Sequence, residues 1–167
     1  MSKIKIVLLF IANIIIDLVL LSRYSIYGAT LAISIPMIII LSMNSKTDSI
    51  TYYAILIGLF KEVSFFPTIG IYALSYYLIS YYSFKRSRLG GMSYKLGLLI
   101  LIISVFLNYI FTNTLRMISM GYFETARLID YLLGPIFTEM LVGFIFYTVI
   151  YVLFFRINAK KKKRYFL

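Results

Sequence analysis

Six apolar segments, separated by short polar breaks, define the sequence. They cover residues 4–22, 26–43, 49–62, 68–84, 96–115 and 131–155. A helix needs about 20 residues to cross a bilayer, with a usual range of about 17–25. Five segments meet this requirement, whereas the uncharged part of the third, residues 49–60, needs a thinner bilayer or help from its flanks. We therefore predict an all-α integral membrane protein with six transmembrane helices in a single domain over residues 1–156 and a tail at 157–167.

Positive charges gather on one side of this predicted topology. With both termini inside, the inner segments hold 13 of the 17 Lys and Arg residues and the outer side holds 4. The cytoplasmic loops of membrane proteins carry such an excess. If the third and fourth segments formed one span instead, Lys61 would lie in the middle of the membrane and the basic N-terminus would lie opposite the basic tail. The six-span arrangement with both termini cytoplasmic is therefore the prediction.

The break between the third and fourth segments, KEVSFFPT at residues 61–68, contains a Lys–Glu pair that is costly near lipid. Pro67 cannot continue a helix and biases Phe66 away from helical geometry. Lys61 has a side chain long enough to snorkel toward the headgroups. We predict a tight outer turn between two short helices, with Lys61 at the membrane surface and Glu62 at the mouth of the bundle.

Composition supports a membrane protein and removes several chemical classes. The chain is 62% hydrophobic and 14% charged, whereas soluble domains are about half apolar and about a quarter charged. The net charge of +11 follows from the positive-inside bias and does not require nucleic acid as a partner. The chain contains neither Cys nor His, so it lacks thiolate metal ligands and the usual general base. We expect no catalytic set, no cofactor and no metal site.

The stretch GLFKE at residues 58–62, followed by PTIGIYAL at 67–74, is similar to a pattern of the MreD family of rod shape-determining membrane proteins. The matching positions are Gly58, Leu59, Gly70, Ala73 and Leu74. Glu62 stands where the family usually has Asp. Residues 25–43 and 132–156 also resemble the second and last spans of the family, although the usual Pro-Asn of the second span is absent.

The resemblance implies a non-enzymatic role in the bacterial cell-elongation complex, in the cytoplasmic (inner) membrane. It implies control of rod shape and side-wall peptidoglycan synthesis through an MreC-like protein. Through MreC it further implies association with the actin-like MreB filament, the RodA glycosyltransferase and a class B penicillin-binding protein. Docking of helix faces within the membrane, through small residues and polar stripes, would provide the contacts.

A second possibility is the substrate-binding subunit of an energy-coupling-factor vitamin transporter. Those subunits are of similar size with six helices, and the MreD family is thought to share their fold. They bind a small molecule in an outward pocket. The first segment here has Ala12 as its single alanine, whereas such subunits use spaced alanines to dock their membrane partner.

Polar residues inside apolar segments are the candidates for partner or pocket contacts. They and the residues around them are Asp17, Gly58, Glu62, Pro67, Gly70, Pro135, Glu139 and Gly143. Asp17 shares a helix face with Asn13 and either pairs with an outer arginine, such as Arg116 or Arg127, or lines an outer pocket that docks a partner.

Glu139 shares a face with Pro135 and Gly143, where the glycine allows another helix to approach closely. It is either a buried structural group or a contact for a partner or substrate. Glu62 and Gly58 share a face in the same way. Glu62, Glu139 and Asp17 would form an acidic cluster at the outer mouth if the helices bring them together.

Two further polar patterns remain. Ser104, Asn108 and Thr112 form a stripe at four-residue spacing, which either bridges helices by hydrogen bonds or lines a ligand site. The cations of the tail meet either anionic lipid or a cytoplasmic protein. They are Lys160, Lys161, Lys162, Lys163 and Arg164.

Overall fold

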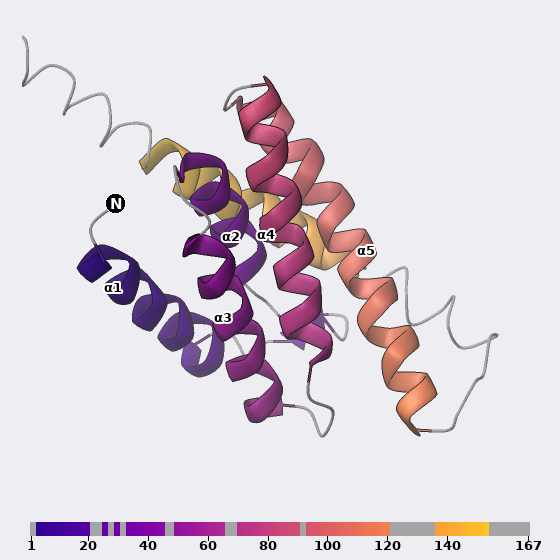
Figure 1. Cartoon of the computed structure of the whole chain (residues 1–167). Helices are drawn as coiled ribbons and strands as arrows, with labels where there is room; N and C mark the ends of the chain where they lie inside the picture. The colour runs from indigo at the N-terminus through magenta and orange to yellow at the C-terminus, as the bar shows by residue number, and fades with distance from the viewer. Residues whose placement is uncertain are drawn as a thin grey trace, which may run out of the picture.

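Helices dominate the fold (Figure 1). The computed structural model describes residues 3–20, 25–26, 29–30, 33–45, 49–65, 70–90, 93–120 and 136–153. The helices are α1 Lys3–Ile14, continued by the π-helical turn η1 Ile15–Leu20, then α2 Ser34–Asn44, α3 Ser49–Phe65, α4 Ile71–Gly90 and α5 Tyr94–Met120. A further helix, Ile136–Leu153, is called the C-terminal helix below. The prediction of a helical protein is confirmed for this part of the chain.

In the described part of the chain, two helices are long and apolar enough to cross a membrane. They contain the windows Tyr94–Phe111 in α5 and Ile136–Leu153 in the C-terminal helix. Shorter apolar helices lie at Leu8–Asp17 and Ser34–Asn44. Membrane character is therefore supported by length and composition.

The helical start predicted at residue 26 is wrong. Ser25–Ile26 and Ala29–Thr30 instead form β1 and β2, an antiparallel pair in which Ser25 faces Thr30. Helix α2 begins only at Ser34 and has 11 residues. At 1.5 Å per residue it is roughly 17 Å long, about half the thickness of a bilayer core.

Helix α2 lies at the centre of the bundle. Nearly all of its side chains are buried, Ser34 and Ser42 included. It contacts α4, α5 and α3, and α3 makes its most extensive contact with α4. A short helix with no lipid-facing side can exist at membrane depth because protein surrounds it on all sides.

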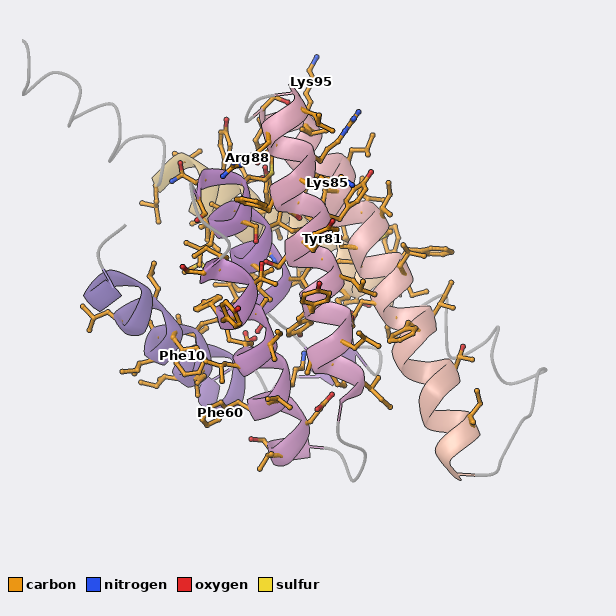
Figure 2. The ribbon with its side chains drawn as sticks, viewed as in Figure 1. Phe10, Phe60, Tyr81, Lys85, Arg88 and Lys95 are labelled. Carbon is orange, nitrogen blue, oxygen red and sulfur yellow. The ribbon has the colours of Figure 1, made fainter. Side chains whose placement is uncertain are left out.

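Helices α3, α4 and α5 run side by side, and each of them runs opposite to the one before it (Figure 1). Helix α1 lies against α3, where Phe10 packs edge-on against Tyr53 and Phe60 at ring distances of 5.8 and 5.6 Å (Figure 2). The C-terminal helix lies against the first half of α5, where the rings of Tyr94 and Tyr147 are 5.7 Å apart and tilted by 40°.

Polar side chains join the helices within this apolar core. The hydroxyls of Ser42 in α2 and Ser80 in α4 are 2.9 Å apart. Ser75 in α4 donates a hydrogen bond to Oδ1 of Asn108 in α5. The bridging interpretation of the α5 stripe is therefore confirmed for Asn108, while the side chain of Thr112 lies outside the described residues.

Candidate functional site

Glu62 lies in the last turn of α3, where its carboxylate closes the N-terminus of α4. The side chain is fully buried. Its Oε2 accepts a hydrogen bond from the N–H of Gly70 at 2.6 Å, and its Oε1 accepts from Tyr72 and from Ala73, the latter at 3.2 Å. The first N–H groups of a helix have no partner within the helix, and a negative charge there is favoured by the helix dipole. Glu62 is therefore a helix cap supplied by the preceding helix.

Gly70 is the reason why the cap of α4 comes from another helix. It is the N-cap residue of α4, since its carbonyl accepts the first helical bond from Leu74 at 3.0 Å. Its φ of +106° is strained for any residue with a side chain. An N-cap residue usually caps the helix with its own side chain, and glycine has none. Glu62 takes over that function.

Gly58, one helical turn before Glu62, forms the closest contact between α3 and α4. A Cβ at this position would lie 2.5 Å from the Cα of Ala73, which is shorter than real Cβ contacts. Residue 58 must therefore be glycine for α3 to lie this close to the backbone of α4. Gly58, Glu62, Gly70 and Ala73 thus belong to one contact, the α3–α4 junction.

Asp17 caps the N-terminus of α2, as Glu62 caps that of α4. The residue is buried on η1, and its Oδ1 accepts a hydrogen bond from the N–H of Ile33 at 2.7 Å. Its Oδ2 accepts from both the N–H, at 3.2 Å, and the hydroxyl of Ser34. Ile33 is the N-cap residue and has an apolar side chain, so it cannot cap the helix itself.

The sequence analysis did not predict this capping role for Asp17. Its hydrogen bonds within the described residues go to the start of α2, and the carboxylate is committed to that helix end. The side chain of Arg116, one of the expected partners, lies outside the described residues, as does Arg127.

Lys61 points into the bundle, so the prediction that it snorkels to the membrane surface is wrong. Its Nζ donates a hydrogen bond to the hydroxyl of Tyr76 at 3.2 Å and lies 5.1 Å from the ring centroid of Tyr72. Its charge interacts electrostatically with the carboxylates of Asp17 and Glu139. A cation is stabilised by the faces of aromatic rings.

Glu139 lies half-buried on the inner face of the C-terminal helix. The same face carries Gly143 and the fully buried Tyr147, one and two turns further on. A Cβ at Gly143 would meet Leu101 and Val105 of α5 at 3.7–3.9 Å, which is ordinary contact. The expected close helix approach at this glycine is present, but it does not require glycine.

The expected acidic cluster forms only in part. Asp17 and Lys61 line one cavity, and the positive charge of Lys61 acts electrostatically on the carboxylates of both Asp17 and Glu139. Glu62 is turned toward the start of α4 and is occupied there. Among the described residues, no group of three acidic, His or Cys side chains is placed to hold a metal ion.

A cavity of about 10 Å³ lies between Asp17 and Lys61. It is also lined by Asn13, Ser34 and Phe60. Asn13 donates to the hydroxyl of Tyr53 at 3.1 Å, while its buried Oδ1 has no partner in this part of the chain. The space is that of about one water molecule, and pockets for small molecules are usually about 300–1,000 Å³.

Seven of the predicted residues lie outside the described residues. They are Pro67, Pro135, Lys160, Lys161, Lys162, Lys163 and Arg164.

Lys61 is the residue whose role the sequence analysis missed. The signal was available in part, because Lys61 lies four residues after the core residue Ile57 and thus on a buried face if the helix continues. Because the predicted helix ends at residue 62, the prediction places Lys61 at the membrane surface and not on this buried face. Helix α3 in fact runs to Phe65, so Lys61 is a full turn from its end.

Comparison of the chain with protein-family models, with curated proteins and with solved structures finds no match in any of the three.

Proposed function

We propose that this chain is a multi-pass membrane protein with an MreD-like, non-enzymatic role in the bacterial cell-elongation complex. The observation that carries the proposal is the α3–α4 junction. Four positions that resemble the family, spread over 16 residues, come together there as Gly58, Glu62, Gly70 and Ala73.

Each of these positions has a physical requirement for its residue type. Gly58 must lack a Cβ because the backbone of Ala73 lies against it, Gly70 must tolerate a positive φ, and residue 62 must carry a carboxylate that accepts the N–H groups at the start of α4, that of Ala73 among them. A pattern imposed by one local geometry supports a shared local fold more strongly than scattered identities do. The Asp that the family usually has at this position would supply the same carboxylate.

The proposed topology has six spans with both termini in the cytoplasm of a bacterium. It is supported by the alternating directions of the helices and by Lys85, Arg88 and Lys95, which lie at one end of the bundle (Figure 2). Such one-sided basic charge is typical of the cytoplasmic side. The half-length α2 lies inside the bundle, so its apolar side chains are covered by protein.

Partner binding would use the outward faces of the two longest apolar helices. On α5 the exposed side chains include Leu99, Phe106 and Leu107, and on the C-terminal helix they include Phe137 and Ile145. Packing of such faces against a membrane helix of an MreC-like protein or a cell-wall synthase is the proposed mechanism. The buried carboxylates would act indirectly, since they hold the helices that carry these faces.

The described part of the chain offers no comparable observation for the vitamin-transporter alternative. The cavity at the end of the bundle where Asp17 lies has about 10 Å³, far below the volume that a vitamin needs.

Affinity purification of the tagged full-length chain from its native membranes in mild detergent tests the proposal. We expect mass spectrometry to identify an MreC-like protein or a cell-wall synthase, enriched over a tagged unrelated multi-pass protein. Recovery of paired ATPases with a second membrane subunit would overturn the elongation role and support the transporter alternative. Recovery of neither set above the control would also refute it.

A matched pair of variants connects this assay to the α3–α4 junction. Glu62→Ala removes the cap of α4, whereas Ser64→Ala changes an exposed residue whose hydroxyl bonds within its own helix, to the carbonyl of Phe60. We expect reduced partner recovery for the first variant and unchanged recovery for the second.

A further inference from the structure

A groove of about 590 Å³ lies between the first half of α3 and the second half of α4. Its walls include the aromatic side chains of Tyr52, Tyr77, Tyr81 and Phe84, and its rim carries Lys85 and Arg88. The volume lies within the usual range for ligand sites, about 300–1,000 Å³. It is distinct from the Glu62 cap, which lies at the opposite ends of these helices.

The α4 side of the groove is built by helical periodicity. Tyr77, Tyr81, Phe84 and Arg88 follow one another at three- or four-residue spacing and share one face. Tyr77 and Tyr81 stack with ring centroids 6.1 Å apart. The groove therefore has a continuous aromatic floor that ends in positive charge.

The two cations are placed over the aromatic rings. Nζ of Lys85 lies 5.9 Å from the ring centroid of Tyr81, and Cζ of Arg88 lies 4.6 Å from that of Phe84. Figure 2 shows Tyr81, Lys85 and Arg88 along α4, toward the end of the bundle where Lys95 lies. Both cationic side chains are exposed, so an anion can reach them from outside the bundle.

We propose that this groove binds one anionic glycerophospholipid of the surrounding bilayer. Its phosphate would lie at Lys85 and Arg88, and an acyl chain would lie along Tyr81, Tyr77 and Tyr52. Charge complementarity selects an anionic headgroup, since the described residues that line the groove include two cations and no acidic side chain. The apolar floor beneath the cations selects a lipid over a soluble phosphate. The inference requires a membrane location but not the MreD-like role.

Native mass spectrometry of the delipidated full-length chain in detergent tests the inference. Dioleoylphosphatidylglycerol and dioleoylphosphatidylcholine are added separately at the same concentrations. We expect one phosphatidylglycerol molecule to bind more tightly than any phosphatidylcholine. Lys85→Gln and Arg88→Gln should each weaken phosphatidylglycerol binding about fivefold, the effect of one cation near a lipid surface.

Arg86→Gln is the matched control, because Arg86 is equally exposed on the same helix but does not line the groove. It should leave the affinity unchanged, as should Lys95→Gln. Equal weakening by Arg86→Gln and Arg88→Gln would mean a diffuse surface attraction and would overturn the site. Displacement of the lipid by glycerol phosphate at comparable concentration would overturn the lipid as occupant.

Tyr81→Ala tests the aromatic floor separately from the charges. It removes an exposed ring without changing the net charge, and it should weaken phosphatidylglycerol binding. Unchanged binding in this variant would refute the acyl-chain part of the proposal. Partner recovery in the affinity purification is measured on different contacts, so failure of either proposal is seen independently.

Discussion

Removal of the Glu62 carboxylate tests whether α4 depends on a cap supplied by α3. Glu62→Ala leaves three backbone N–H groups, those of Gly70, Tyr72 and Ala73, without their acceptor. None of them has a carbonyl partner within α4, because they precede or begin the helix. The substitution therefore breaks the cap without changing the apolar contact between the helices.

The expected cost follows from the burial of the three donors. A buried donor without a partner costs about 1–3 kcal/mol. Ala73 is buried, whereas Gly70 and Tyr72 are half-buried and can recover part of the loss from water. We expect Glu62→Ala to destabilise the fold by about 2–4 kcal/mol.

Glu62→Gln gives a graded comparison. Its amide oxygen can accept the bonds that Oε1 accepts from Tyr72 and Ala73, but its NH₂ group would face the N–H of Gly70. The variant also loses the interaction of a negative charge with the helix dipole. We expect a cost of about 1–2 kcal/mol, between wild type and Glu62→Ala.

Unfolding by sodium dodecyl sulfate in mixed micelles, followed by far-ultraviolet circular dichroism, measures these costs. Ser64→Ala is the control and should change the free energy of unfolding by less than about 0.5 kcal/mol. If Glu62→Ala unfolded at the same detergent fraction as Ser64→Ala, the cap would contribute nothing and the argument from the α3–α4 junction would fail.

Three further changes address the other contacts, and the same unfolding assay measures all of them. Gly58→Ala places a methyl group against the backbone of Ala73 and should cost about 1–3 kcal/mol. Asp17→Ala should cost about 1–3 kcal/mol, because the buried start of α2 loses its acceptor. Lys61→Met should destabilise the fold, and combination with Glu139→Gln should recover part of the loss, with a coupling energy of about 0.5–3 kcal/mol.

Each change has a control or a contradicting result. Gly143→Ala has room for its methyl group and should be neutral or stabilise by up to about 1 kcal/mol through helix propensity. Equal effects of the two glycine substitutions would contradict the close contact at Gly58. Wild-type stability of Asp17→Ala would show that water replaces the cap of α2, and strict additivity of the Lys61 and Glu139 variants would show that the two groups do not interact.

The apolar pattern located the helices well where the breaks between them are strong. The predicted segment 96–115 lies within α5, and 131–155 contains the described C-terminal helix. The pattern also placed Gly58 and Glu62 on one face. It underestimated α4, which continues through Lys85 and Arg88 to Gly90, because charged residues end an apolar run without ending a helix.

The apolar pattern does not predict contacts between segments that are distant in the sequence. Residues 26–43 are uncharged throughout, so nothing in them marks Ser34 as the start of α2. That start depends on Asp17, which is 17 residues earlier in the chain and on a different helix. In the same way, the direction of Lys61 depends on the rings of Tyr72 and Tyr76 in α4.

The two acidic caps restrict where a partner can bind. A carboxylate that accepts several backbone hydrogen bonds in a buried place cannot be released to another protein without leaving those donors unsatisfied, which is costly where water is scarce. Asp17 and Glu62 are committed in this way, and the half-buried Glu139 interacts electrostatically with Lys61. Substitutions at these residues would therefore weaken a complex only by weakening the fold.

A substitution on the exposed face of α5, such as Leu107→Ala, would reduce partner recovery at unchanged stability if that face is the docking surface. Comparison of the two classes of variant separates loss of the fold from loss of the interface.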